Sequence, residues 1–449
     1  MTFRDLRTFV DFLDKNGELI RIEETLDSKF EVSAAIRHGA KMTDKAILVE
    51  KVKGYHCPVV GNLLGTKKRL ALAIGAAEED IINKLLIKEK DLIPSKTIDK
   101  GPVKENIISN DIDLFKTLPI LTYHEDDASP YITQGIVFMK DRESGLETMG
   151  VHRLQVKGKN RLGGFFTGKT SSEIIRKAEK RGEALEIAIA IGVDPSTLLA
   201  SVIWAPFADK FGIAGAFRGS PLELVQAETV DLKIPAHAMF VLEGKIIPGL
   251  KETEGPFGES NGYYITAENP VIEINAITHQ KNQIYSVFVP WDREDGTMLD
   301  LFATPHIHKS IKSVLPSLVD IKLFFTAGFA IVSIKKRYES EPRELLYFLL
   351  STVPFIKIAM VVDEDVDLES QKEINWAMGT RCFPDRDIIV MDSVTGSPLD
   401  PTAKGKDFVV SKFGLDATKP LDKINDFKKI RPPEEVQKRI TTLFEKYLG

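Results

Sequence analysis

The sequence predicts a multi-domain α/β protein with a β-rich middle part. Its 449 residues, 43% of them hydrophobic, are enough for more than one hydrophobic core. Helical and strand-like segments alternate at both ends of the chain, whereas strand-like runs dominate between them. We therefore expect an N-terminal α/β domain over 1–112, a barrel or split β-barrel over 113–310, and a C-terminal α/β domain over 311–449.

The N-terminal segments begin with an apolar stripe. Residues Phe3, Leu6, Phe9, Val10 and Leu13 recur at helical spacing, which predicts a helix over 2–16. The same reasoning predicts strands at 18–22, 47–52 and 57–63 and helices at 29–41, 67–76 and 78–87. The charged, proline-containing passage 88–104 has the composition of a linker, although a loop of this length can also wrap a domain.

The middle segments are strand-like runs separated by glycines and charges. They lie at 131–140, 147–158, 186–193, 238–247, 271–280 and 283–291.

From residue 311 strands and helices alternate again, which favours an open α/β sheet. The expected strands are 321–328, 330–336, 355–367 and 386–392, and the expected helices are 339–351, 369–378 and 433–448. The segment 411–418 has the pattern of a loop with one basic residue. The terminal helix is expected to serve oligomerisation.

Composition excludes several classes of protein. With 60 Lys+Arg against 65 Asp+Glu the net charge is −5, which gives no attraction to nucleic acid or anionic membranes. Cys57 and Cys382 show no ligand or disulfide spacing, and this fits a reducing compartment. The N-terminus lacks the apolar stretch of a signal peptide, and Pro354 and Lys357 interrupt the most apolar run. We expect a cytoplasmic protein that does not span a membrane.

The first candidate site is the acidic segment 254–259, Glu-Gly-Pro-Phe-Gly-Glu, which we expect to form a rigid turn. Two carboxylates held on such a turn can divide acid and base roles when their environments differ. The alternative is a solvated turn whose glutamates do nothing.

The second candidate is Arg153, which alternation places on one face of its strand with Val151 and Gln155. An arginine inside a barrel must find an anion, because an unpaired buried charge is costly. Glu254 or Glu259 is the natural partner. The alternative is an ion pair with a purely structural role.

The third candidate is the run 163–170, which matches the phosphate-loop pattern G-x-x-x-x-G-K-[ST] and precedes a predicted helix over 171–181. Backbone amides, Lys169 and the helix start together favour an anion site. Nucleotide hydrolysis is disfavoured, because no following apolar strand ends in an aspartate suited to magnesium. A plain helix start is the remaining alternative.

Taken in order, these segments resemble the UbiD family of prenylated-FMN-dependent decarboxylases. The matching runs are Arg7–Ile22, Val59–Leu63, Arg153–Leu162, Ala190–Pro195, Val241–Gly244, Glu254–Glu259, Val361–Val366 and Lys412–Thr418. The resemblance implies an N-terminal α/β domain, a flavin-reductase-like split barrel and a C-terminal α/β domain, assembled as a homodimer or homohexamer.

The resemblance also implies roles for individual residues. Arg153 matches the arginine of the catalytic network, Glu254 the carboxylate that orients it, and Glu259 the proton donor to the product carbon. The cofactor performs the electronic step and the protein supplies orientation and a proton. The positions that match cofactor contacts are Thr148, Val151, His152, Arg153, Phe165, Phe166, Thr167, Lys169, Thr170, Ser171, Glu243 and Lys412.

The metal site departs from the family pattern. An asparagine, a histidine and a glutamate usually hold a divalent ion beside the cofactor phosphate, and here these positions are Thr148, Lys169 and Glu243. One hypothesis is that the ammonium of Lys169 replaces the metal, with Glu243 as its counter-charge. The other is a metal, such as manganese with or without potassium, held by Glu243, Thr148 and water.

The expected substrate is an aromatic, heteroaromatic or α,β-unsaturated carboxylic acid, and the reaction is its reversible decarboxylation. A prenyl-flavin synthase would supply the cofactor. One alternative is an anhydromevalonate-phosphate-type decarboxylase of isoprenoid precursor synthesis, for which His306, His308 and Lys309 are candidate contacts to a second anion. A P-loop-like phosphate-binding or nucleotide-binding module is the other alternative.

Overall fold

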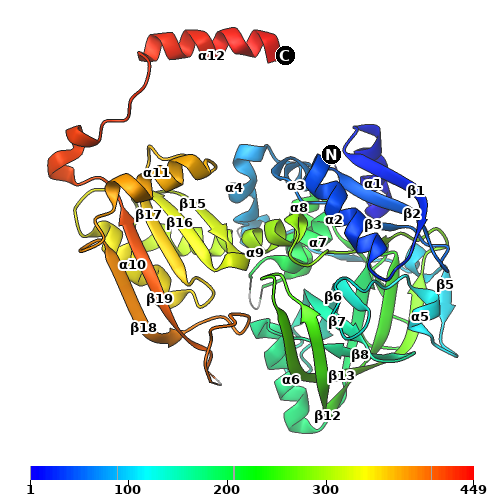
Figure 1. Cartoon of the computed structure of the whole chain (residues 1–449). Coiled ribbons are helices and arrows are strands. Elements are labelled where there is room, and N and C mark those ends of the chain that lie inside the picture. The colour runs from blue at the N-terminus through cyan, green and yellow to red at the C-terminus, as the bar shows by residue number, and fades with distance from the viewer. Residues whose placement is uncertain (1, 88, 206–207, 406, 449) are drawn as a thin grey trace. The chain divides into compact units, whose positions relative to one another are not determined.

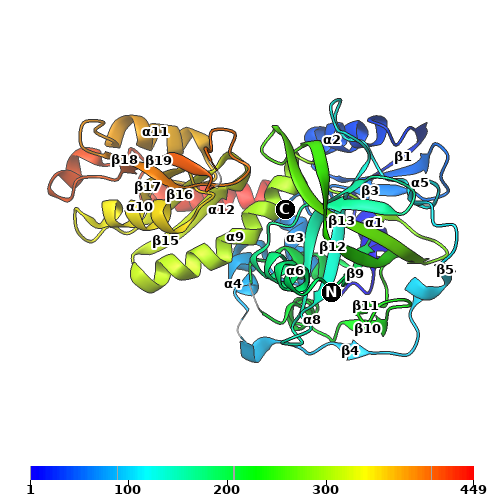
Figure 2. The ribbon, with the colours of Figure 1, turned by 90° about the horizontal axis from the view of Figure 1, so that it is seen from below.

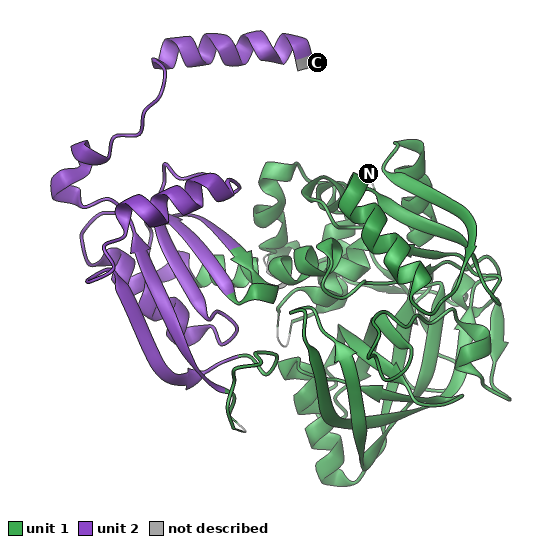
Figure 3. Ribbon diagram, viewed as in Figure 1, with its two compact units in different colours: residues 1–310, 323–328, 397–408 green, residues 311–322, 329–396, 409–449 purple. Residues whose placement is uncertain are grey.

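The computed structural model describes residues 2–87, 89–205, 208–405 and 407–448. The chain forms two compact units (Figure 3). Unit 1 comprises residues 1–310, 323–328 and 397–408, and unit 2 comprises 311–322, 329–396 and 409–449. The predicted N-terminal and middle parts thus share unit 1. The three-domain division at 112 and 310 stays a prediction.

The N-terminal part of unit 1 is a sheet of order β1-β2-β3-β14. Strand β1 (Leu19–Leu26) runs parallel to β2 (Ala46–Val52), which is antiparallel to β3 (Val59–Gly61). Its helices are α1 (Leu6–Lys15), α2 (Glu31–Thr43), α3 (Lys67–Ile74) and α4 (Ile81–Leu85). The prediction for 283–291 is wrong, because only Tyr285–Ser286 (β14) pairs as a strand, and it pairs with β3 outside the barrel.

The centre of unit 1 is a closed barrel, as the strand-like runs predict. The strands follow one another as β12-β9-β6-β7-β8-β13, and pairing between β12 and β13 closes the ring. Their bounds are β6 (Tyr131–Lys140), β7 (Glu147–Val156), β8 (Arg161–Gly164), β9 (Leu185–Ile191), β12 (Phe240–Gly258) and β13 (Tyr264–His279), with β5 (Asn106–Ile108) added at the edge of β13. Helix α6 (Lys169–Arg181) lies beside the barrel (Figures 1 and 2).

Two helices of unit 1 are not predicted by the periodic patterns of the sequence. Helices α7 (Pro195–Val202) and α8 (Lys210–Arg218) are almost wholly buried, so they lack the polar face that a periodic pattern requires. Short elements complete the unit: α5 (Leu114–Thr117), β10 (Glu223–Gln226) and β11 (Lys233–Pro235). The passage 88–104 contributes β4 (Lys96–Thr97), which pairs with β10, so this passage wraps the unit.

Unit 2 is an open sheet of order β15-β16-β17-β19-β18. Its strands are β15 (Leu318–Phe324), β16 (Phe329–Ile334), β17 (Ile358–Asp363), β18 (Ile388–Thr395) and β19 (Val409–Ala417). Helices α10 (Glu341–Thr352) and α11 (Gln371–Arg381) cover opposite faces of the sheet (Figure 2). The prediction of a loop at 411–418 is wrong, because most of this segment belongs to β19, between β17 and β18.

Two long helices complete the description. Helix α9 (Arg293–Val314) runs from one unit into the other, and α12 (Glu434–Leu448) ends the described chain. None of the described helices has the apolar length that a membrane crossing requires.

Candidate functional site

The structure brings the three predicted catalytic side chains together. On β7, Arg153 donates from Nε to Oε1 of Glu254 at 3.2 Å and from Nη2 to Oε2 at 2.7 Å. Its remaining nitrogen, Nη1, forms an ion pair with Oε1 of Glu259. The side chain of Arg153 is 7% exposed and that of Glu254 is fully buried, so the pairing satisfies charges that would otherwise be costly to bury.

Aromatic rings hold the guanidinium of Arg153 in place. Its central carbon lies 4.0 Å from the ring centre of Phe165 and 5.3 Å from that of Phe257. A cation over an aromatic face is attracted by the ring quadrupole, and the attraction grows when water is excluded. Phe165 follows β8 and Phe257 ends β12, so two separate strands fix the plane of the guanidinium.

The segment 254–259 is not a free-standing turn. It is the irregular end of β12, where the register against β13 shifts between Glu254 and Phe257. Gly255 has φ +104°, and a Cβ there would lie 2.4 Å from the carbonyl oxygen of Ile265, so only glycine fits. The shift changes the direction of the strand, so that the carboxylates of Glu254 and Glu259 both meet Arg153.

Two polar residues hold this strand end, and the sequence patterns did not single them out. The carboxylate of Asp127 accepts from the backbone N–H groups of Gly258 (2.9 Å), Tyr123 (3.0 Å) and His124 (2.8 Å). Asn269 on β13 donates to Oε2 of Glu254 at 3.0 Å. Asp127 lies in an acidic loop and Asn269 in a strand, and neither context distinguishes them from solvated residues.

Tyr131 on β6 is a further buried neighbour of the network. Burial raises the pKa of its hydroxyl, and the negative charge of Glu254 raises it further. The hydroxyl is therefore held neutral beside the carboxylate.

The predicted anion loop lies between β8 and α6. Gly168 caps the start of α6 and has no side chain that could accept from the backbone N–H groups of the first turn. Thr167 and Lys169 are exposed, whereas Thr170 and Ser171 are buried in that turn. An uncapped helix start with an adjacent ammonium suits a phosphate group.

His152 connects this loop to the catalytic strand. Its Nε2 lies 3.3 Å from the hydroxyl of Ser171, and its ring packs against Phe166 at 4.8 Å. Burial, and to a smaller extent the charge of Lys210, lowers the pKa of His152 to about 4, so the ring is neutral at pH 7. Burial likewise lowers the pKa of Lys210, a residue without a sequence signal, to about 8. On the same strand Thr148 is buried and Val151 half-buried.

Two of the predicted cofactor contacts have other partners. The carboxylate of Glu243 accepts from the N–H groups of Glu228 (2.8 Å) and Thr229 (2.6 Å) and from the Thr229 hydroxyl (2.9 Å). Lys412 lies on β19 of unit 2 and donates to the carbonyls of Leu350 (3.1 Å) and Val353 (2.9 Å). Their roles towards a cofactor stay predictions.

The site fits a flavin better than it fits a metal. The buried amide nitrogen of Gln134 on β6 has no hydrogen-bond partner within the described chain, and the acceptors of a flavin ring would satisfy such a donor. Across the described residues, no group of three His, Cys, Asp or Glu side chains could hold a metal ion, and no ion pair joins Lys169 to Glu243.

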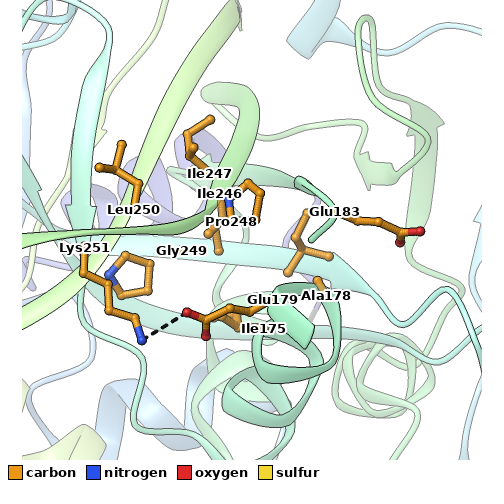
Figure 4. Close-up of a pocket in the computed structure, with 12 residues that line it drawn as sticks. Ile175, Ala178, Glu179, Glu183, Ile246, Ile247, Pro248, Gly249, Leu250 and Lys251 are labelled. Atoms are coloured by element: carbon orange, nitrogen blue, oxygen red, sulfur yellow. Dashed lines mark ion pairs between the residues drawn. The ribbon is translucent and has the colours of Figure 1, made fainter. Parts of the chain in front are cut away.

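A shallow hollow between α6 and the middle of β12 lies apart from this network (Figure 4). It holds about 10 Å³, enough for about one water molecule. Lys251 and Glu179 form an ion pair of 3.2 Å at its rim. None of the network residues lines it, so it is not the reaction site.

Comparison with known proteins agrees with this geometry. The chain matches the N-terminal domain of 3-octaprenyl-4-hydroxybenzoate carboxy-lyase over residues 10–88, its Rift-related domain over 96–292 and its C-terminal domain over 296–417. All three belong to the UbiD family.

Individual relatives extend over nearly the whole chain. An anhydromevalonate phosphate decarboxylase of Methanothermobacter thermautotrophicus is 33% identical, with 94% of this chain and 100% of the relative covered. A phenolic acid decarboxylase of Sedimentibacter hydroxybenzoicus is also 33% identical, with 93% and 92% covered.

Among solved structures, the UbiD-class enzyme HmfF from Pelotomaculum thermopropionicum in complex with FMN superposes with a TM-score of 0.91. It is 36% identical, with 96% of this chain and 97% of that chain covered. An evolved dimeric form of HmfF holds prenylated FMN. The three matched domains, the extent of these similarities and the buried Arg153 network lead to one conclusion: the chain belongs to the UbiD family of carboxy-lyases.

Proposed function

We propose that this carboxy-lyase decarboxylates an aromatic, heteroaromatic or α,β-unsaturated carboxylic acid with prenylated FMN as its cofactor. The observation that carries the proposal is the buried network, in which Arg153 pairs with both Glu254 and Glu259. A second carboxylate on the same guanidinium provides a group that can exchange with a substrate.

The residues divide the work as follows. Glu254 and the two aromatic rings fix Arg153, which binds the substrate carboxylate and orients it. That carboxylate competes with Glu259 for Nη1, and a carboxyl group that loses its cationic partner holds a proton more readily. Glu259 then delivers this proton to the carbon that has lost CO2.

The bound cofactor supplies the electron-accepting centre that makes the carbon–carboxylate bond breakable. The first turn of α6, with Lys169 and the buried hydroxyls of Thr170 and Ser171, would hold its phosphate. His152, neutral and buried, keeps the loop against β7 through Ser171. In this proposal the ammonium of Lys169 takes the place of the metal ion.

The proposal is tested by producing the protein together with a prenyl-flavin synthase, which we propose as its cofactor supplier. We expect the purified protein to retain a flavin absorption spectrum and to release CO2 from at least one acid of a panel. Loss of all flavin during purification would contradict the proposal. Thermal stabilisation by ATP but not by FMN would favour the nucleotide-binding alternative.

An unsaturated acid that also carries a phosphate is the second candidate substrate. It is favoured by the relative of Methanothermobacter thermautotrophicus, which acts on anhydromevalonate phosphate. Including a phosphorylated enoic acid in the panel separates this candidate from aromatic acids. Turnover of the phosphorylated acid alone would assign the chain to that branch.

We propose further that the protein is a cytoplasmic homodimer. Both cysteines are free thiols, which suits a reducing compartment. Every described side chain of α12 is exposed, although four apolar residues form a stripe along the helix. An exposed apolar stripe of this kind is typical of a helix that packs against another chain. A second copy of the chain is the occupant that we propose, because an evolved form of the relative HmfF is dimeric.

A further inference from the structure

A second charged site lies in unit 1 and has no part in the network described above. It is a cavity of about 250 Å³ lined by Arg37, Lys41, Trp291, Asp292 and Arg293. Three of these side chains are cationic and one is anionic. A cavity of this size admits a group larger than a single ion, and its charge favours an anion.

Arg37 is the innermost of these cations and is only partly committed to protein groups. Its Nη2 donates to the carbonyl of Pro290 at 2.7 Å and lies 2.9 Å from Nε2 of His124. Its Nε is buried without a hydrogen-bond partner within the described chain. Among the described residues, the Nη1 group takes part in no hydrogen bond, so it can donate to a ligand.

The lining itself carries three positive charges and one negative charge. Lys41 is exposed and follows Arg37 by one turn of α2, so the two cations share a helix face. Arg293 is paired with Asp44, which lies outside the cavity lining. Asp292 is the only carboxylate of the lining, and burial raises its pKa. Asp295, a buried carboxylate outside the lining, also interacts with the charge of Arg37.

The cavity adjoins the strand end that carries Glu259. On one side, His124 lies against Gly258, the residue before Glu259, since a Cβ at Gly258 would lie 2.5 Å from Nδ1 of His124. On the other side, a Cβ at Gly262 would lie 3.0 Å from the ring of Trp291. The N–H of Gly262 in turn donates to the carbonyl of Glu259 at 2.9 Å. His124 and Trp291 thus pack against the chain on both sides of Glu259.

We propose that this cavity binds a second anionic group of the substrate, a phosphate monoester or a carboxylate, while Arg153 holds the carboxylate that is lost. The proposal rests on the proposed decarboxylase function and narrows its substrate class to acids with two anionic groups. Arg37 supplies a directional donor, and Lys41 and Arg293 add charge.

The first test measures binding without turnover. Inorganic phosphate and acetate are titrated calorimetrically into cofactor-loaded protein, in which the cofactor phosphate already fills its own site. We expect one of the two anions to bind, and we expect Arg37→Gln and Lys41→Gln each to weaken that binding at least tenfold. Lys51→Gln, at an exposed position near the end of β2, is the matched control and should bind as wild type does.

Two variants are needed because Arg37 also holds Pro290 and His124, whereas Lys41 is exposed and its substitution is safe for folding. Preference for phosphate identifies a phosphate monoester, and preference for acetate identifies a carboxylate. Absence of binding of both anions, or binding unchanged in Lys41→Gln, overturns the proposal.

The second test uses turnover. Acids with and without a second anionic group are compared, and the ratio of their kcat/KM values should fall at least tenfold in Lys41→Gln but stay constant in Lys51→Gln. A ratio that does not change in Lys41→Gln overturns the proposal. If no acid is turned over at all, the decarboxylase function fails, while the calorimetric result still decides whether the anion site exists.

Discussion

Arg153 and Glu254 form a bidentate, buried pair across the barrel, with distances of 3.2 Å and 2.7 Å between their atoms. Such a pair has planar geometry, which fixes the orientation of the guanidinium as well as its position. Only Nη1 is left to face Glu259, so the geometry of one pair determines which nitrogen meets the reacting groups.

Glu254→Gln should therefore impair both stability and activity. The substitution removes one charge from a buried pair and leaves Arg153 incompletely balanced, which costs about 3 kcal/mol of the free energy of unfolding. The freed guanidinium also loses its orientation, and we expect kcat/KM to fall about 100-fold. Denaturant unfolding and CO2 release measure the two effects.

The matched control is Glu252→Gln, on the same strand. Glu252 pairs with Lys157 and Arg161 at a partly exposed position, so its loss should cost less than about 1 kcal/mol and leave turnover near that of the wild type. Equal effects of the two substitutions would show that the buried pair has no special role.

Glu259→Gln should separate cofactor binding from turnover. Glutamine keeps the size of the side chain but cannot deliver a proton, and positioned proton transfer contributes roughly 10²–10⁴-fold to a rate. We expect the flavin spectrum of the variant to match that of the wild type while CO2 release falls by that factor. Turnover like that of the wild type would remove Glu259 from the proton-donor role.

The barrel and the terminal sheets could be predicted because amphipathic periodicity marks their strands and helices. The buried helices α7 and α8 could not, since they are buried on nearly every side and so lack an amphipathic pattern. Strand β19 was mistaken for a loop, because Gly414 and the polar residues around it mask a strand that is sandwiched between two others.

The catalytic trio could be proposed only because its members match one family in order. Alternation placed Arg153 inside the barrel, but the register shift that joins Glu254 and Glu259 on one guanidinium depends on pairing between distant strands. Asp127, Asn269 and Lys210 were missed for the same reason. Their roles come from contacts across the fold, which composition and local spacing do not reveal.

Lys169→Gln should weaken the binding of FMN. Lys169 is the exposed cation at the uncapped start of α6, and losing one charge-assisted hydrogen bond to the phosphate should lower affinity about tenfold. Quenching of flavin fluorescence measures the dissociation constant. Lys180→Gln, in the last turn of the same helix, is the control and should leave affinity unchanged.

Elemental analysis of the active, cofactor-loaded protein tests whether Lys169 takes the place of a metal ion. If Lys169 replaces the metal, divalent metal should stay well below one equivalent, and treatment with a chelator should not lower turnover. Stoichiometric manganese that activity requires would support the alternative site at Glu243 and Thr148.

The stability of the protein should fall at acidic pH because of His152. Its pKa is about 4 in the folded protein against an ordinary value of 6.5, so the unfolded chain binds more protons between these values. The contribution of this histidine to the free energy of unfolding is therefore fully present above pH 6.5. It falls by about 3 kcal/mol as the pH drops to 4. His152→Gln should remove this part of the slope in denaturant unfolding at several pH values. Identical slopes for the variant and the wild type would contradict the burial of a neutral histidine.

The apolar stripe of α12 should control assembly. Val436, Ile440, Leu443 and Tyr447 recur at spacings of four, three and four residues and are 40%, 38%, 44% and 80% exposed. Burying Ile440 and Leu443 against a second chain would contribute about 3–6 kcal/mol, so replacing both with serine should weaken the dimer at least about 100-fold. Light scattering after gel filtration measures the mass. Lys438→Gln, on the polar face, is the control and should stay dimeric. A wild-type protein that elutes as a monomer, or a serine variant that remains a dimer, would exclude α12 as the contact.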